Sequence, residues 1–379
     1  MKIPESWESV EIGDILTLGG GRDYKHLDVG DIPVYGTGGY MTSVNEYLYN
    51  GESVGIGRKG TIDKPVFLKG KFWTVDTLFY THSFKNTTPY FVYILFQNIN
   101  WRKYSEATGV PSLSRSIIEP IKINLPPLPE QQKIAEILST VDAKIEIVDQ
   151  QIAETQELKK GLMQQLLTKG IGHTEFKDSA LGKIPKSWEV NKIGETCHSF
   201  AGGTPKRSVK EYYKNGTIPW VKSGEVDNDN ITSTKESVTE LAINETSTRL
   251  IKSKSILVAL YGATAGKVGV LKMDACSNQA VLAINSNVDF ISNKFLYHFL
   301  KSITKTLLVL CQGSGQPNLS KKIIDNVNIP IPQKGEQRHI SEILTSVDNK
   351  LEVLSEKKTT YQEMKQGLMQ QLLTRKVRV

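Results

Sequence analysis

The chain has 379 residues, of which 39% are hydrophobic and 23% charged, so it has the composition of a globular protein with enough chain for two or three cores. A formal net charge of +7 and a pI of about 9.0 favour a polyanionic partner. The three cysteines, Cys197, Cys276 and Cys311, lack ligand-like spacing, which argues against a disulfide framework and for a reducing compartment. No apolar run approaches the roughly 18 residues of a membrane helix, and the N-terminus lacks the apolar core of a signal peptide, so we expect a cytoplasmic protein.

An internal repeat sets the order of the elements. The opening Ile-Pro-x-x-Trp-x-x-x-x-Ile-Gly starts at Ile3 and again at Ile184. Glu136–Asp142 returns as Glu342–Asp348, and the Gly-Leu-Met-Gln-Gln-Leu-Leu-Thr segment starts at Gly161 and again at Gly367. The ends of the two copies match while their middles diverge, which is the pattern expected of two different surfaces on one fixed scaffold.

Each copy reads as a β-rich region with a short helix, then a proline-rich stop, then a long helix. In chain order we expect strands over 53–56 and 72–80 with a helix over 89–96, and then strands over 255–261 and 280–284 with a helix over 293–300. The stops are 125–129 and 329–332, because proline ends a strand but suits the first turn of a helix. This predicts an α+β protein with mixed domains at 1–128 and 182–332, long helices at 129–170 and 333–379, and a linker at 171–181.

The long helices carry heptad seams that step alternately by four and three residues. Both seams have a polar interruption, at Thr155 and Lys159 in the first helix and at Lys358, Tyr361 and Lys365 in the second. Two matched seams in one chain most simply pack on each other, the alternative being two unrelated amphipathic core helices. The residues that we expect to pair the helices are Ile134, Leu138, Val141, Ile145, Val148, Leu162 and Leu166 in the first, and Ile340, Leu344, Val347, Leu351, Leu354, Leu368 and Leu372 in the second.

Several enzyme signatures occur in fragments that fail on context. Gly55–Gly60 spells the dinucleotide pattern but leads into a strand-like segment, and Gly262–Lys267 is one residue short of a P-loop and lacks its hydroxyl. Asn124–Leu128 only partly matches a methyltransferase loop, because a leucine intervenes and the aromatic residue is missing, and a helix stop is enough to explain the segment. Asp142 and Asp348, each two residues before a lysine, echo half a nuclease motif but are interpreted as a solvated helix face. With no triad, metal site or cofactor loop, we expect a non-catalytic chain that binds no cofactor.

Loops rich in glycine, hydroxyls and cations recur at equivalent places in both copies. Glycine permits close approach of the backbone, Lys and Arg neutralise phosphates, and Arg, Asn and Gln pair with base edges. Each loop alone is an ordinary surface turn, but the recurrence favours double-stranded DNA as the partner. The candidate DNA-binding residues are Arg22, Tyr40, Arg58, Lys59, Lys64, Ser114 and Arg115 in the first copy, and Lys206, Arg207, Lys222, Tyr261, Lys267, Gln279, Gln316, Asn318 and Lys321 in the second.

Over its whole length the chain resembles the specificity subunit of type I restriction-modification systems. The duplicated opening and helix motifs carry the resemblance, together with Arg58–Thr61 matching Tyr261–Thr264 and Gly109–Ser114 matching Gly315–Ser320. One departure is Val110 where the second copy has Gln316, so a DNA contact is expected at Gln316 rather than at Val110.

The resemblance implies a role in DNA methylation and in host defence by restriction-modification. Each variable region would be a target recognition domain for one half of a split DNA target, and the helices would pair antiparallel with pseudo-twofold symmetry and fix the gap. Two modification subunits using S-adenosylmethionine would dock on the helices, and restriction subunits would add ATP with Mg. The alternatives are a specificity protein of a fused or type II-like enzyme, a coiled-coil adaptor with protein-binding heads, and, least in keeping with the motifs, a methyltransferase.

Overall fold

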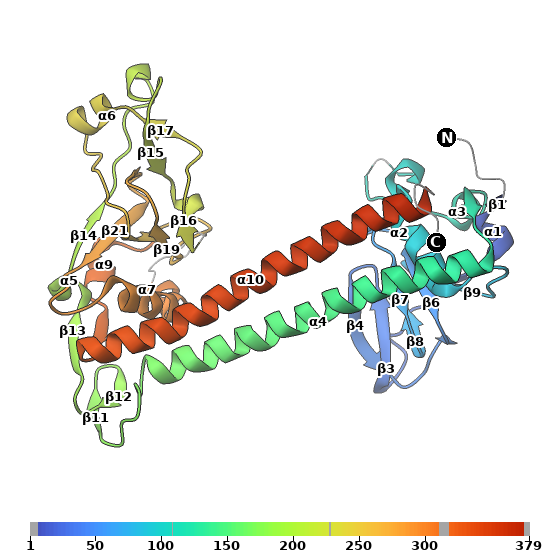
Figure 1. Cartoon of the computed structure of the whole chain (residues 1–379), viewed down its shortest axis with the longest axis horizontal. Helices are drawn as coiled ribbons and strands as arrows, with labels where there is room; N and C mark the ends of the chain where they lie inside the picture. The colour runs from blue at the N-terminus through green and yellow to red at the C-terminus, as the bar shows by residue number, and fades with distance from the viewer. Residues whose placement is uncertain (1–6, 108, 227–228, 311–317, 375–379) are drawn as a thin grey trace. The chain divides into compact units, whose positions relative to one another are not determined.

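The structure, a computed structural model, describes residues 7–107, 109–226, 229–310 and 318–374. The chain forms two compact units, one of residues 1–150 with 355–379 and the other of residues 151–354. Both are mixed α/β, and each contains part of the long helices α4 (Leu128–Leu166) and α10 (Lys334–Leu373) (Figure 1). The fold class predicted from the sequence is confirmed. The linear division at 128, 170, 181 and 332 stays a prediction, because the compact units cut across both helices.

The first unit is built on two small sheets. An antiparallel sheet has the order β2-β9-β6-β7, and a mixed sheet has the order β4-β3-β8-β5 with β3 and β8 parallel. The strands are β2 (Thr17–Gly20), β3 (Val29–Gly36), β4 (Gly39–Val44), β5 (Tyr49–Asn50), β6 (Ser53–Gly57), β7 (Val66–Leu68), β8 (Lys71–Thr74) and β9 (Leu78–His82). The predicted strand at 53–56 is confirmed, but the single strand predicted over 72–80 is wrong. It is two strands in different sheets, divided by a turn in which the Leu78 amide donates to the Val75 carbonyl at 2.9 Å.

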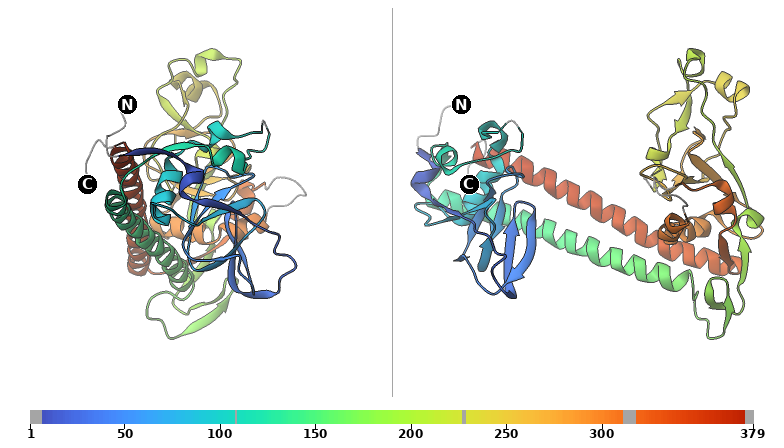
Figure 2. Two further views of the ribbon diagram at one scale, coloured as in Figure 1. Left: turned by 90° about the vertical axis from the view of Figure 1, so that its right-hand side faces the viewer. Right: turned by 180° about the vertical axis from the view of Figure 1, so that it is seen from behind.

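The second unit repeats the antiparallel sheet of the first unit, but has a different small sheet in place of the mixed sheet β4-β3-β8-β5. Its larger sheet has the order β14-β21-β18-β19-β16, in which the first four strands correspond to β2, β9, β6 and β7. The strands are β14 (Cys197–Ala201), β16 (Asn230–Ile231), β18 (Ile256–Ala259), β19 (Val268–Leu271) and β21 (Val281–Ser286). A smaller sheet holds β17 (Ser237–Val238), β15 (Ile218–Val221) and β20 (Cys276–Ser277), and β11 (Phe176–Ser179) with β12 (Gly182–Pro185) forms a separate hairpin after α4 (Figure 2). Both strands predicted in this copy are confirmed.

The two short helices predicted from the sequence are α2 (Pro89–Asn98) and α7 (Asn293–Ser302). Each is capped in the same way, because the hydroxyls of Thr88 and Ser292 accept hydrogen bonds from the amides of Phe91 and Phe295. Their apolar faces are buried in the core of their own unit. These equivalent helices therefore hold the sheets against the long helices.

The repeated opening motif ties the start of each domain to its long helix. The indole of Trp7 donates to Glu130 at 3.1 Å, and the indole of Trp188 donates to Glu336 at 2.8 Å, so the same residue pair opens both long helices. A Cβ on Gly194 would lie 2.9 Å from the Asp325 Cβ, which explains the glycine of the motif. The first residues of the first copy, Ile3 included, lie outside the described residues.

Four short strands frame the two domains. In each domain the first strand pairs antiparallel with the last strand. This pairing brings the end of the domain back to its start, directly before the long helix begins. The pairs are β1 (Glu8–Glu11) with β10 (Lys122–Leu125), and β13 (Glu189–Lys192) with β22 (Asn328–Ile331).

The helix after each stop is anchored by a buried glutamine. The Gln131 amide donates to the Pro126 carbonyl at 2.8 Å, and the Gln337 amide donates to the Pro332 carbonyl at 2.9 Å. Both side chains are buried, and each completes its remaining bonds inside its own domain. The Glu-Gln dipeptide after the proline stop is therefore the joint between domain and helix.

Charged pairs fix the register of the two long helices. In the first unit Lys365 Nζ lies 2.7 Å from Asp142 Oδ1 and Lys358 Nζ lies 2.6 Å from Asp149 Oδ1. In the second unit Lys159 pairs with Asp348. The two residue numbers of every pair have the same sum, so the helices run antiparallel in one constant register. The interpretation of Asp142 and Asp348 as a solvated face was wrong, because the seam lysines of the other helix neutralise both.

All fourteen residues predicted to pair the helices are buried or half-buried. Half-buried ones are Ile145, Leu162, Leu351 and Leu368. The core of the first unit also includes Met369 and Leu372 from the end of α10, and the core of the second includes Leu166, the last residue of α4, and Leu167, which follows it. Which of the fourteen side chains touch the other helix directly stays a prediction.

Candidate nucleic-acid interface

Two arginines of the first unit converge on one aromatic ring. The guanidinium carbons of Arg58 and Arg115 lie 6.0 and 5.9 Å from the ring centroid of Phe79, and both arginines are exposed. A buried ring beneath two cations holds them at the surface with their charge still available to an anion. Arg115 also lies beside Gly20, where an added Cβ would be 3.2 Å from its Nη2.

Backbone pairing brings the basic loops of this unit together. Lys59 forms a β-bridge with Ser112, and the Leu113 amide donates to the Arg58 carbonyl at 2.8 Å. Gly60 turns the chain with φ +94, and a Cβ placed there would lie 3.7 Å from the Thr37 hydroxyl at the tip of the β3–β4 hairpin. Three of the predicted loops therefore meet at one end of the sheets.

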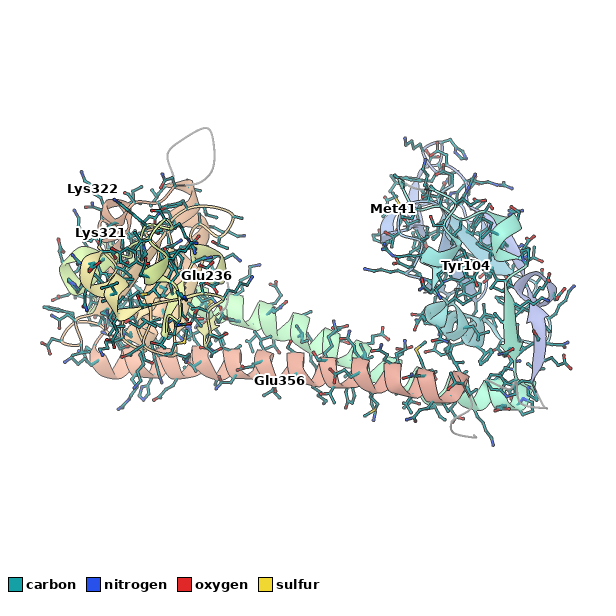
Figure 3. The ribbon with its side chains drawn as sticks, turned by 90° about the horizontal axis from the view of Figure 1, so that it is seen from above. Met41, Tyr104, Glu236, Lys321, Lys322 and Glu356 are labelled. Carbon is teal, nitrogen blue, oxygen red and sulfur yellow. The ribbon has the colours of Figure 1, made fainter. Side chains whose placement is uncertain are left out.

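The other candidates of this unit are placed around that meeting point with different surroundings. Tyr40, exposed on β4 beside the labelled Met41 in Figure 3, shares a hydrogen bond of 3.1 Å with Ser43. Ser114 bonds Glu106 at 3.2 Å and precedes α3 (Arg115–Ile118), so its hydroxyl is already engaged. Arg22 follows β2 and is exposed, and exposed Lys64 lies in the β6–β7 connection.

The second unit builds the same bridge from different residues. Tyr261 pairs with Asn318, and the Leu319 amide donates to the Leu260 carbonyl at 2.7 Å. Gly262 has φ +90, which makes it the equivalent of Gly60. Lys59-Gly60 therefore corresponds to Tyr261-Gly262, and the predicted match of Arg58 to Tyr261 was wrong by one residue. The match of Ser112 to Asn318 is confirmed by the two bridges.

Arg207 and Lys222 both pair with Glu236, a carboxylate that was not among the predicted site residues. Arg207 Nη2 lies 2.6 Å from Glu236 Oε2, and Lys222 pairs with the other oxygen of Glu236, labelled in Figure 3. The Lys222 ammonium and the Arg207 guanidinium keep the pKa of Glu236 below its usual value. Arg207 also stacks 4.4 Å from the Tyr213 centroid and 5.2 Å from that of Trp220, so it has a structural role as well as a charge.

The remaining candidates of the second unit lie near the Tyr261–Asn318 bridge or near the cluster of Arg207, Lys222 and Glu236. The Thr264 hydroxyl donates to the Ser223 carbonyl at 2.8 Å, which joins the Lys222 loop to the loop after Tyr261 that also carries Lys267. Gln279 accepts a hydrogen bond from Thr204, close to Lys206 in the chain. Lys321, labelled in Figure 3, starts α9 (Lys321–Asp325) and pairs with Asp325. Gln316 lies outside the described residues.

Where each domain packs on the long helices, one of its side chains contacts the aspartate of an interhelical ion pair. This side chain is Tyr90 in the first unit and His298 in the second. Tyr90 of α2 donates to Asp142 at 2.6 Å, and burial with this hydrogen bond raises the pKa of Tyr90. In the second unit His298 of α7 lies 3.2 Å from the Thr345 hydroxyl, and its Nδ1 lies 3.9 Å from Asp348. Burial lowers the pKa of His298 to about 4, so the ring is neutral.

The two glycine-rich segments that partly match enzyme motifs lie within or between strands. Gly55–Gly57 lies within β6 and Gly262–Lys267 connects the antiparallel strands β18 and β19, so neither opens a helix. Burial raises the pKa of the Cys197 and Cys276 thiols, which makes them poor nucleophiles. Among the described residues no cluster of histidine, cysteine and carboxylate side chains has the makings of a metal site. Within the same residues, none of the helices has the length and hydropathy to span a bilayer.

Comparisons with known proteins agree with this architecture. A family model described as the type I restriction modification DNA specificity domain matches residues 4–157 and 185–361. The type I restriction enzyme MjaVIII specificity subunit of Methanocaldococcus jannaschii is 31% identical, over 100% of this chain and 95% of that protein.

Solved structures of low sequence identity share the fold. The type I restriction-modification S subunit from M. genitalium superposes with a TM-score of 0.70 at 16% identity, covering 98% of both chains. A chain from a structure on complex assembly and conformational transition of the type I R-M system gives 0.58 at 14% identity, covering 98% of this chain and 99% of that one.

Proposed function

The chain belongs to the family of type I restriction-modification specificity subunits, and from that premise we propose that its two candidate loop clusters are its two DNA-reading surfaces. The observation that carries the proposal is the repeated bridge, Lys59 with Ser112 and Tyr261 with Asn318, which sets basic and polar loops on equivalent strands of both domains. The frame is common to both domains, whereas the side chains that it presents differ. Each domain would therefore read its own half of a bipartite target.

Phosphate and base contacts would come from different members of the clusters. We assign Arg58, Lys59, Arg115, Lys206 and Lys267 to phosphates, because they are exposed cations on or next to the bridge loops. Tyr40, Ser114, Tyr261 and Gln279, with Gln316, are assigned to the base-reading surface. Arg207 is also expected to contact a phosphate, although its ion pair with Glu236 would neutralise part of its charge.

The paired helices would set the gap between the half-sites. Their three charged pairs hold one register, and a slip would separate every pair at once. The gap would then be a fixed number of base pairs. The paired helices would thus hold the two different domains at a fixed separation.

We propose that the chemistry of the complex is supplied by partners and that this chain is not catalytic. Two modification subunits would dock on the helix pair and bring S-adenosylmethionine for adenine methylation, and restriction subunits would bring ATP with Mg. The support from this chain is indirect: the Cys276 thiol is buried and Cys197 is half-buried, and its two glycine-rich segments lie within or between strands rather than at the start of a helix. Such a complex would work in the cytoplasm, where the DNA is.

The deciding experiment is methylome sequencing of cells that express this chain with its modification subunit, compared with cells that lack the chain. We expect methylated adenines in one split motif of fixed gap that disappear without the chain. Exchange of residues 1–128 or 182–332 for those of a relative should change only one half of the motif. An unchanged methylome with an assembled complex would contradict the proposal.

Salt dependence tests the phosphate assignment separately. Replacing Lys59 or Arg115 by Gln should weaken binding to all DNA sequences alike, and should reduce the slope of log K against log salt by about 0.9 per lost contact. Variants that bind with an unchanged slope would remove those residues from the assignment. A loss confined to one target sequence would place them at a base instead.

A further inference from the structure

Three consecutive apolar side chains are exposed at the end of a short helix, α8 (Thr304–Val309), in the second unit. Leu308, Val309 and Leu310 are 38%, 83% and 45% exposed, whereas Leu307 directly before them is buried in the core of the unit. Runs of exposed apolar residues are avoided on protein surfaces unless they bind something. Residues 308–310, the apolar segment of this unit, therefore indicate a contact surface.

The first copy carries a polar segment at the equivalent place. Trp101 starts η1 (Trp101–Tyr104), is buried like Leu307, and lies 206 residues before it, which is also the spacing between the Ser112 and Asn318 bridges. The next three residues of both copies therefore correspond, and the same backbone position is polar in one copy and aliphatic in the other. The residues of the first copy, all exposed, are Arg102, Lys103 and Tyr104, the last labelled in Figure 3.

In both copies this segment packs against a loop that carries candidate DNA-binding residues. In the first unit Arg102 Nε lies 2.6 Å from Asp63 Oδ2 in the β6–β7 connection. In the second unit a Cβ on Gly266, in the β18–β19 connection next to Lys267, would lie 3.5 Å from the Leu308 Cγ. An ion pair in one copy and a van der Waals contact in the other thus hold the segment beside equivalent loops.

The apolar segment is continuous with the candidate DNA interface of its unit. The loop that Leu308 touches begins at Tyr261, one residue of the bridge, and Leu310 lies eight residues before Asn318, the other residue of the bridge. Leu308 fixes the segment at this loop, while Val309 is the most exposed of the three side chains. DNA that binds the loop would therefore meet the apolar segment as well.

The chemistry of DNA restricts what an aliphatic side chain can read. Phosphates and polar base edges would lose water against Val309 or Leu310 without gaining a hydrogen bond. The C5-methyl group of thymine is the apolar group that the major groove presents. Every half-site would offer one, because each adenine that a modification subunit methylates is paired with a thymine.

We propose that Val309 and Leu310 read the methyl group of a thymine in the half-site of the second domain. The inference rests on the proposed function, and it adds the chemical group that this domain selects and the residues that select it. The first domain has Lys103 and Tyr104 at the equivalent positions, so the contact is confined to one half-site. The two domains would thus make contacts of different kinds from the same backbone position.

Uracil scanning of the target tests the contact, because deoxyuridine differs from thymidine only in lacking the methyl group. The full chain, in complex with its modification subunit, is titrated with duplexes in which each thymine of the second half-site is replaced in turn. That half-site is the one that changes when residues 182–332 are exchanged. The wild-type complex should bind one of these duplexes about fourfold more weakly, the effect of removing one methyl group from an apolar contact.

Val309→Ala completes a double-mutant cycle with that methyl group. The variant should bind the thymine duplex more weakly than wild type does, and should bind the thymine and uracil duplexes equally. Leu310→Ala should reduce the discrimination in the same way, which keeps the cycle available if Val309→Ala folds poorly. Neither variant loses a phosphate contact, so the slope of log K against log salt should stay that of wild type.

The matched control is Val288→Ala in the same unit. Val288 is 73% exposed and follows β21, whose other end adjoins the bridge through the hydrogen bond from the Leu260 amide to the Ala280 carbonyl. This variant should keep the fourfold discrimination.

Two results overturn the inference and leave the proposed function intact. One is a uracil effect that persists unchanged in both Val309→Ala and Leu310→Ala, and the other is a second half-site in which no thymine is sensitive to uracil. A target in which neither half changes when residues 182–332 are exchanged overturns the proposed function as well.

Discussion

At the residue scale, the candidate cations differ in what already neutralises them. Arg58 and Arg115 lie over Phe79, which leaves their charge exposed, whereas Arg207 and Lys222 share Glu236. The sequence predicted the first pair because both residues flank glycine and hydroxyl-rich turns. It could not predict the second arrangement, because Glu236 is separated from both cations in a divergent region without a repeated spacing.

Glu236→Gln tests the role of that carboxylate. Its loss adds one net positive charge and releases Arg207 and Lys222 toward an anion, so non-specific DNA binding should strengthen and its salt slope should steepen. Fluorescence anisotropy with DNA at several salt concentrations measures this. The equivalent removal of a remote exposed carboxylate, Asp178→Asn, is the control. Weaker binding by Glu236→Gln would mean that the carboxylate positions the two cations for their contacts.

His298 predicts a loss of stability in acid. Burial lowers its pKa from 6.5 to about 4, so the folded chain holds the neutral ring while the unfolded chain takes up a proton near pH 6.5. Its contribution is complete above pH 6.5 and is lost as the pH falls toward 4, by about 1–3 kcal/mol. The free energy of unfolding of wild type and His298→Gln, measured in urea across this range, should converge in acid. A difference in unfolding free energy between the two proteins that stays constant with pH would contradict the lowered pKa of His298.

At the element scale, the helix seam is held by ion pairs where the apolar heptads stop. The polar interruptions at Lys159 and Lys365 are predicted from periodicity, which is a local property of the sequence. Their partners Asp142 and Asp348 were misinterpreted. From sequence alone an aspartate next to a seam position is expected to face solvent, because its partner lysine lies on the other helix. The sheets were predicted less well, since the parallel pairing of β3 with β8 joins segments far apart in the chain.

A double-mutant cycle measures the strength of this seam. Asp142→Asn and Lys365→Met should couple by about 1–2 kcal/mol in the free energy of unfolding, because the two side chains are only 28% and 14% exposed. The control cycle is Glu157→Gln with Lys160→Met, a pair in which both side chains are 75% exposed, where coupling of about 0.5 kcal/mol or less is expected. Equal coupling in both cycles would remove the special role of the seam.

At the scale of the whole molecule, each core is completed by the end of the other copy's helix. The core of the first unit includes Leu372 of α10, and the core of the second includes Leu166 of α4. The repeat and the heptads predicted two domains joined by paired helices. Sequence alone could not show this exchange, because a leucine in a heptad is equally suited to a helix partner or to a domain core.

Two single substitutions test the exchange against each other. Leu372→Ala should destabilise the chain by about 2–5 kcal/mol and Leu166→Ala by a similar amount, since both side chains are buried. Hydrogen exchange should rise in β6 and β9 for Leu372→Ala, and in β18 and β21 for Leu166→Ala. Faster exchange in the opposite unit, in either variant, would contradict the assignment of these core contacts.

The shared cores also bear on synthesis. A ribosome makes the first domain early, yet the residues Met369 and Leu372 that complete its core are added only after the whole of the second domain has been made. The second domain takes Leu166 and Leu167 from a helix that is already made, so its core is complete in sequence before that of the first. The usual order in which the N-terminal domain finishes folding first is thereby reversed, and a nascent chain exposes an unfinished first domain until the end of α10 has been made.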